Sequence, residues 1–239
     1  MALPRFVDLE HLANELSGDT RYRRIATVIR KAALTQSCIA DIAQAQSNVD
    51  ALRPLLASSR GKGTIGRAAT ENALLFQAVI LYARATATSG QSGERGSISI
   101  LEKLDDAQRI DHKSLVDLRN RAVAHVYSGE AVAGDVWHKQ ALYLVETDQG
   151  WKTASAVLRL QVSRDTLDRL DRILPVAHSL LLARFHKHTG KITDLMNEHG
   201  VSIATFDRCP FDAATFFGNE REVWKSLETM DKGHGAGLI

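Results

Sequence analysis

The sequence predicts an all-α protein, an up-and-down helical bundle with one inserted β-hairpin. Three observations lead to this prediction. Only four prolines occur in 239 residues, whereas alanine, leucine, arginine and glutamine, which favour helices, are common. Apolar residues recur at steps of three and four over most of the chain, which is the spacing of one helix face. A single segment near residue 150 shows strand-type alternation around a turn signal instead.

The first half of the chain predicts two long helices. The first begins with Asp19 or Thr20 as its N-cap, and Pro54 kinks or ends it. Residues 58–66 are rich in glycine and predict a loop, after which a broad apolar face predicts a second helix over 68–88. The apolar stripe of the first helix consists of Ile25, Val28, Ala32, Ile39, Ile42, Val49, Leu52 and Leu56.

The spacing of apolar residues changes in the middle of the chain. Residues 98–104 predict a short helix, and residues 111–127 predict a longer one. A hairpin over about 140–162 follows, because two β-prone runs flank the turn signal Asp148–Gly150, and Leu158, Leu160 and Val162 alternate with polar residues. We therefore expect the hairpin to be inserted between helices.

A last long helix begins at its N-cap Ser163 and runs to about His188, with Pro175 as a candidate kink. The sequence thus predicts a bundle over residues 1–190 that includes the hairpin, and a C-terminal extension over 191–239. The extension holds aromatic residues that indicate packing on the body, namely Phe206, Phe211, Phe216, Phe217 and Trp224.

Composition narrows the functional class. Thirty basic and 28 acidic residues give a net charge of +2, which excludes a polybasic coat protein but permits a local basic face. Cys38 and Cys209 lie far apart, which fits neither a disulfide framework nor a zinc ribbon and suits a reducing compartment. The start has no secretory signal, and no apolar run approaches the roughly 20 residues that cross a bilayer. We expect a cytoplasmic protein with no membrane partner.

One motif has a chemical interpretation. Arg119 is followed by Asn120, by His125 six positions after the arginine, and by Tyr127. This pattern resembles the signature of the HEPN superfamily, in which Arg precedes His by four to six residues and His is often followed by one residue and Tyr. A polar residue, frequently Asn, commonly follows the arginine. Domains of that family are helical bundles with the motif near the end of a late helix, so the setting over about residues 20–190 is similar.

The resemblance implies a metal-independent endoribonuclease that leaves a 2′,3′-cyclic phosphate, such as a toxin or an antiphage effector. The residue types suit this reaction. The imidazole of His125 transfers protons near neutral pH, and the guanidinium of Arg119 offers forked donors to a phosphate. Asn120 would hydrogen-bond the phosphate or orient the imidazole. No cofactor or metal ion is needed. The alternative is a non-catalytic module of the same fold that binds RNA, a nucleotide or a protein.

Helix geometry does not decide which arginine is catalytic. On a regular helix, six steps of about 100° place His125 and Arg119 on different faces, whereas Arg121 lies four positions from His125 on the same face. Either the helix ends or distorts near Ala124, or a twofold homodimer brings the arginine of one subunit to the histidine of the other. The family pattern favours Arg119, and helical periodicity favours Arg121.

Two further expectations concern partners. In the toxin branch of the family, the tyrosine that corresponds to Tyr127 is adenylylated by a partner nucleotidyltransferase, which silences the nuclease. A homodimer is also expected from the family, and the apolar content of the hairpin and tail predicts that one of them covers or extends the dimer face. The plain alternative is that the motif is a polar helix end whose basic residues complement the helix dipole.

Overall fold

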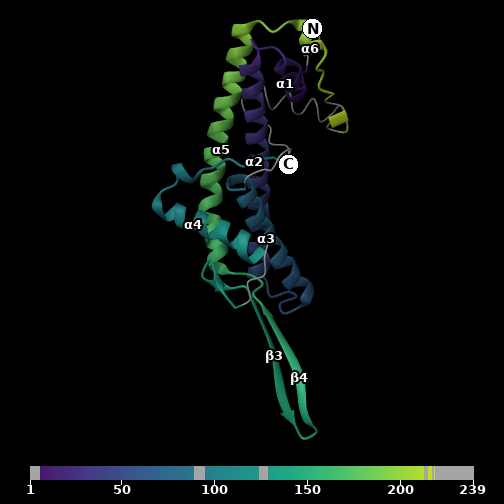
Figure 1. Ribbon diagram of the computed structural model, residues 1–239, viewed down its shortest axis with the longest axis vertical. Helices are drawn as coiled ribbons and strands as arrows, with labels where there is room; N and C mark the ends of the chain where they lie inside the picture. Colours follow the sequence, from purple (N-terminus) through teal and green to yellow (C-terminus); the bar gives the residue numbers. More distant parts are fainter. Residues whose placement is uncertain (1–5, 89–94, 124–128, 213–214, 217, 219–239) are drawn as a thin grey trace. The chain divides into compact units, whose positions relative to one another are not determined.

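The computed structural model describes residues 6–88, 95–123, 129–212, 215–216 and 218 (Figure 1). It confirms a mostly helical fold with an inserted hairpin. The chain divides into two compact units, one made of Met1–Ala33 with His188–Ile239 and the other of Leu34–Lys187. The predicted boundary near residue 190 falls inside a helix, close to the second of these divisions.

The elements of the described residues are, in chain order, α1 (Leu9–Ser17), α2 (Arg23–Ala57), α3 (Ile65–Thr86), the 3₁₀ turn η1 (Leu101–Lys103), α4 (Asp106–Leu118), the π-helical turn η2 (Arg119–Val123), β1 (Ala131–Val132), β2 (Asp135–Val136), β3 (His138–Thr147), β4 (Gly150–Arg159), α5 (Arg164–His199) and α6 (Ile203–Asp207). None of these helices combines the length and apolar character that a bilayer-crossing segment requires.

Proline and glycine do not end the two longest helices. The prediction that α2 kinks or ends at Pro54 is wrong about its end, because the helix continues to Ala57. Pro175 lies inside α5, which also continues through Gly190 to His199. Apolar side chains beyond that glycine, including Leu195, are buried, so the packed face of α5 extends past the predicted end. Tertiary packing of an amphipathic face here outweighs the local cost of a helix breaker.

Local signals fixed several helix starts. The hydroxyl of Ser163 accepts a hydrogen bond from the backbone N–H of Thr166 at 3.1 Å, as predicted for the N-cap of α5. Asp105 caps α4 in a reciprocal capping box with Gln108, so α4 begins five residues before the predicted Asp111. The prediction that Asp19 or Thr20 caps the first long helix is wrong, because α2 begins at Arg23, and the carboxylate of Asp19 accepts instead from the backbone N–H of Arg21 at 2.9 Å.

The first unit contains α1, α6 and the adjoining turns of α2 and α5. The backbone of Asp8 donates to the carbonyl of Cys209 at 2.9 Å, beside an isolated bridge between Val7 and Pro210. Cys209 is fully buried. The predicted tail is thus partly regular and holds the N-terminal segment in place. The predicted packing residues Phe217 and Trp224 lie outside the described residues.

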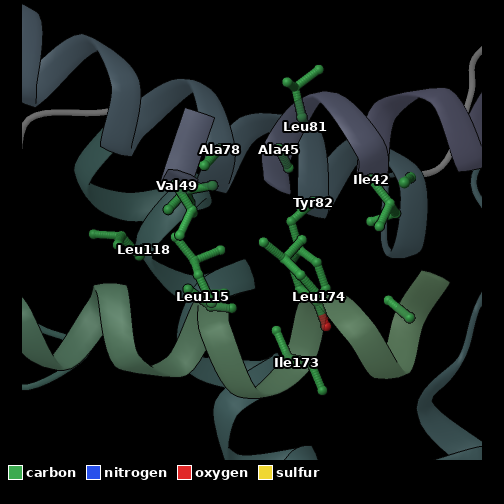
Figure 2. Close-up of a cluster of buried hydrophobic side chains, with 14 of the residues drawn as sticks. Ile42, Ala45, Val49, Ala78, Leu81, Tyr82, Leu115, Leu118, Ile173 and Leu174 are labelled. Atoms are coloured by element: carbon green, nitrogen blue, oxygen red, sulfur yellow. The ribbon is translucent and has the colours of Figure 1, made fainter. Parts of the chain in front are cut away.

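The core of the second unit is built by four helices. Figure 2 shows side chains of α2, α3, α4 and α5 converging on one cluster. Burying a side chain of leucine size contributes about 1.5–3 kcal/mol relative to leaving it exposed. Because α4 contributes Leu115 and Leu118, this cluster fixes the helix that leads into the motif. The labelled members are Ile42, Ala45, Val49, Ala78, Leu81, Tyr82, Leu115, Leu118, Ile173 and Leu174.

One polar pair lies within this core. The hydroxyl of Tyr82 lies 2.8 Å from Nδ1 of His112, and the two rings meet edge to face with centroids 5.8 Å apart. Both residues are buried. Burial lowers the pKa of His112 and raises the pKa of Tyr82 above its ordinary value, so both stay neutral near pH 7. The unprotonated nitrogen of a neutral imidazole can accept a hydrogen bond from the tyrosine hydroxyl, so the pair places no charge in the core.

This pair predicts a loss of stability in acid. The ordinary histidine pKa is 6.5, and the pKa of His112 in the folded protein lies below it. The unfolded chain therefore takes up a proton first, so the free energy of unfolding falls as the pH drops below about 6.5, by at most about 1.4 kcal/mol per pH unit. We expect the melting temperature of His112→Gln to depend less on pH between 7.5 and 5.5 than that of the wild type. Parallel profiles would contradict the assignment.

The predicted hairpin is present with shifted limits. Strands β3 and β4 pair antiparallel from His138 with Arg159 to Thr147 with Gly150, and Gly150 has a φ of +100° that suits glycine at the turn. The prediction that the second strand continues to Val162 is wrong, because β4 ends at Arg159. Leu160 and Val162 pack instead, partly buried, against the core. The ribbon formed by β3 and β4 extends away from the helices of its own unit (Figure 1).

Candidate functional site

The helix α4 does not continue as a regular helix into the motif. It ends at Leu118, and Arg119–Val123 form the π-helical turn η2. The backbone N–H of Arg119 is shared between the carbonyls of Leu115 and Val116 at this junction. A π turn bonds residue i to i+5, so the face relationships of a regular helix do not hold beyond it. The predicted regular helix is therefore wrong over Arg119–Val123, and the rest of its predicted span, from Ala124 to Tyr127, lies outside the described residues.

Arg119 and Asn120 form a local pair at the start of η2. The guanidinium of Arg119 donates to the side-chain carbonyl of Asn120 at 3.0 Å. Arg119 is half-buried and Asn120 is exposed. Within the part of the chain that the structure describes, no carboxylate pairs with Arg119. Its positive charge is thus balanced by a neutral amide only, which leaves it suited to an anionic ligand.

Arg121 has a different environment. Its guanidinium lies 2.6 Å from Glu130 and 3.5 Å from Asp117, with about a third of the side chain exposed. The two carboxylates neutralise the cation and join η2 to the residues that follow the motif. Binding a phosphate at Arg121 would require one of these ion pairs to break. The environments of the two arginines therefore differ: Arg119, which the family pattern favours, has no carboxylate partner among the described residues, and Arg121, which helical periodicity favours, has two.

The predicted histidine and tyrosine, His125 and Tyr127, lie outside the described residues. No distance joins them to Arg119 or Arg121, and their roles remain predictions. Distortion of the helix was one of the two predicted ways to bring arginine and histidine together, and η2 is such a distortion, although it begins earlier than expected. Of the predicted site residues, the structure brings together Arg119 and Asn120.

A cavity of about 390 Å³ lies beside η2, and the sequence did not predict it. Ala122 of η2 lines it together with Phe76 of α3 and Trp137, whose ring centroids are 5.3 Å apart. The Trp137 indole is buried and donates to the carbonyl of Val132 at 3.0 Å. Ten residues line the cavity, namely Ala69, Asn72, Phe76, Ala122, Val132, Trp137, His138, Arg159, Leu160 and Gln161.

Two side chains with nitrogen donors, an imidazole and a guanidinium, line the edge of this cavity. His138 and Arg159 are cross-strand partners at the base of the hairpin. In the described part of the chain, Arg159 forms no ion pair and no side-chain hydrogen bond. The signal that could have found this pair is the hairpin turn itself, because counting outward from Asp148 and Gln149 places the two residues opposite one another.

No group of three or more His, Cys, Asp or Glu side chains among the described residues is arranged to hold a metal ion. Comparison with protein-family models, with curated proteins and with solved structures yields no match. The resemblance to the HEPN superfamily therefore stays a prediction that depends on four residues, Arg119, Asn120, His125 and Tyr127.

Proposed function

We propose that the chain is a metal-independent endoribonuclease of the HEPN type. The observation that supports this best is the state of Arg119. Arg119 is half-buried at the start of a π-helical turn, and its guanidinium is bonded to Asn120 and has no carboxylate partner among the described residues. A guanidinium in this state favours a phosphate ligand, and π turns are frequent at functional sites.

The reaction is an internal transesterification. The 2′-hydroxyl of a ribose attacks the adjacent phosphorus, the new P–O2′ bond forms, and the P–O5′ bond breaks. His125 accepts the hydroxyl proton or delivers a proton to the departing 5′-oxygen, and solvent water carries out the other transfer. Arg119 stabilises the charge that grows on the phosphorane oxygens, and Asn120 holds the guanidinium. The products are a 2′,3′-cyclic phosphate and a 5′-hydroxyl.

Three finer points belong to the same proposal. The protein acts in the cytoplasm as a toxin or an antiphage effector with RNA as its substrate. It works as a homodimer. Adenylylation of Tyr127 by a partner nucleotidyltransferase would silence it, because a bulky phosphate group beside the motif repels RNA by charge and blocks it sterically.

The first test is cleavage in a chelator. We expect the purified wild type to cleave mixed-sequence RNA in excess EDTA and to leave 2′,3′-cyclic ends, which mass spectrometry of the products identifies. His125→Ala should lower the rate by about 100-fold or more, the usual contribution of a general acid or base. The control is Arg109→Ala, because Arg109 lies on α4 and pairs with an exposed residue, Asp106.

The outcomes separate the candidate functions. Cleavage that stops in EDTA, or that persists unchanged in His125→Ala prepared in the same way, refutes the proposal. Tight RNA binding without cleavage by the wild type identifies the non-catalytic module instead. Harm to the expressing host that disappears with His125→Ala supports the toxin role.

A further inference from the structure

One face of the β3–β4 hairpin exposes large apolar side chains. The cross-strand register places the even-numbered residues of β3 and the odd-numbered residues of β4 on the same side. On this side Leu142 is 78% exposed, Leu144 63%, Trp151 67% and Val157 56%. We call it the leucine face, and it consists of His138, Gln140, Leu142, Leu144, Glu146, Trp151, Thr153, Ser155, Val157 and Arg159.

A ribbon of this kind is poorly stabilised alone. An isolated two-stranded hairpin is marginally stable in water, and a contiguous exposed apolar patch marks an interaction surface. The opposite side also exposes apolar side chains, Tyr143 (46%), Val145 (39%) and Leu158 (69%), but it carries a lysine near each end, Lys139 and Lys152. The leucine face therefore exposes four large apolar side chains against three, and it lacks the like charges that the two lysines place at both ends of the other side.

The two ends of the leucine face are complementary. At the tip, the cross-strand pair Glu146 and Trp151 presents a carboxylate and an exposed indole. At the base, the cross-strand pair His138 and Arg159 presents an imidazole and a guanidinium that has no ion-pair partner among the described residues. The base also borders the 390 Å³ cavity, whose walls include Phe76 and other apolar residues.

The spacing makes these ends match a second copy of the same chain. Residues 138 and 146 are equally far from Leu142, and residues 151 and 159 are equally far from Ser155, its cross-strand partner. Consider two hairpins stacked face to face, with a twofold axis in the plane between them at the level of this central pair. The axis places the tip of each hairpin over the base of the other. The two contacts lie about 27 Å apart along the strands, and one twofold operation forms both.

We propose that the leucine face packs against the leucine face of a second copy, with the two hairpins antiparallel. Each Trp151 enters the cavity at the base of the partner hairpin, and each Glu146 pairs with the partner's Arg159 and His138. Leu142 meets its own copy at the axis, with the sheets about 10 Å apart. The same face carries the tip groups that would insert and the base groups that would receive them, at equal distances from its centre. This match identifies the partner as a second copy of the chain. This proposal is independent of ribonuclease activity.

The test uses charge reversal and sedimentation velocity of the full chain. The wild type should be a dimer at micromolar concentration. Glu146→Arg and Arg159→Glu should each raise the dimer dissociation constant by about a hundredfold or more, because each change opposes like charges at two symmetric contacts. Mixing the two variants should restore a dimer, since every contact in the mixed pair is again between opposite charges. This mixing also shows that both variants are folded.

Matched controls come from the other side of the same strands. Lys139→Glu changes the charge at the base as Arg159→Glu does, and Tyr143→Ala removes an aromatic ring as Trp151→Ala does, yet neither alters the leucine face. We expect these controls to dimerise like the wild type, and Trp151→Ala to lose about thirtyfold in affinity, as for an aromatic anchor. A monomeric wild type, or single reversals that dimerise normally, would overturn the proposal, whatever the result for RNA cleavage.

Discussion

Arg119→Ala is expected to lower kcat/KM for RNA cleavage by about 100- to 1,000-fold. The guanidinium is the group in the described motif that can stabilise charge on the phosphorane oxygens, and removing one preorganised donor of this kind typically costs that much. Arg119→Lys should recover part of the loss, because the ammonium keeps the charge but lacks the forked donors. The cleavage rates of the wild type, Arg119→Ala and Arg119→Lys can be measured with a fluorogenic RNA substrate in EDTA.

Arg121→Ala is the matched comparison for Arg119→Ala. Its guanidinium is held between Asp117 and Glu130, so its removal should lower the melting temperature and change kcat/KM by less than about tenfold. If Arg121→Ala loses more activity than Arg119→Ala, the catalytic arginine is the one that helical periodicity favoured. Wild-type activity in both variants would show that neither arginine takes part in the mechanism.

Asp111→Ala should destabilise the protein by about 2–4 kcal/mol. Asp111 on α4 is 6% exposed and accepts two hydrogen bonds from Arg172 of α5, at 2.8 and 2.9 Å, while Arg169 lies 3.8 Å away. Removing one partner of a buried ion pair leaves the remaining charges without their counter-charge. Because water reaches the exposed side chain of Arg172, we expect a loss of stability below the upper end of the usual range. The free energy of unfolding in urea, followed by circular dichroism, measures the change.

The control for Asp111 lies on the same helix. Asp106 pairs with Arg109, but its side chain is 98% exposed, so Asp106→Ala should change the free energy of unfolding by less than about 0.5 kcal/mol. The difference between the two variants reports burial rather than the number of ion pairs. Similar values for both would show that the link between α4 and α5 carries little of the stability.

Sequence patterns located the elements well where a local interaction decides the structure. Ser163 was predicted to start α5 because a hydroxyl before an apolar periodic run caps a helix, and that bond is present. The hairpin followed from the turn before Gly150. Helix ends were harder, because the cost of Pro54 or Gly190 is small beside the burial of the residues around them, which no local pattern measures.

The candidate site was predictable in composition but not in geometry. The motif selected Arg119 and Arg121 together, and only the positions of Asp117 and Glu130 distinguish them. The π turn begins directly after Leu118, which is fully buried in the core, and no local residue pattern marked this position. The cavity at the hairpin base combines residues of α3, η2 and both strands, so it required the tertiary fold.

The two buried cysteines can report the local opening of each unit. Cys38 lies in the second unit and Cys209 in the first, and both thiols are free and fully buried. Burial also raises the pKa of Cys38, which slows alkylation further. A thiol reagent can reach either one only when its surroundings open. The labelling rates of the two peptides therefore report the opening of each unit separately, without any engineered probe.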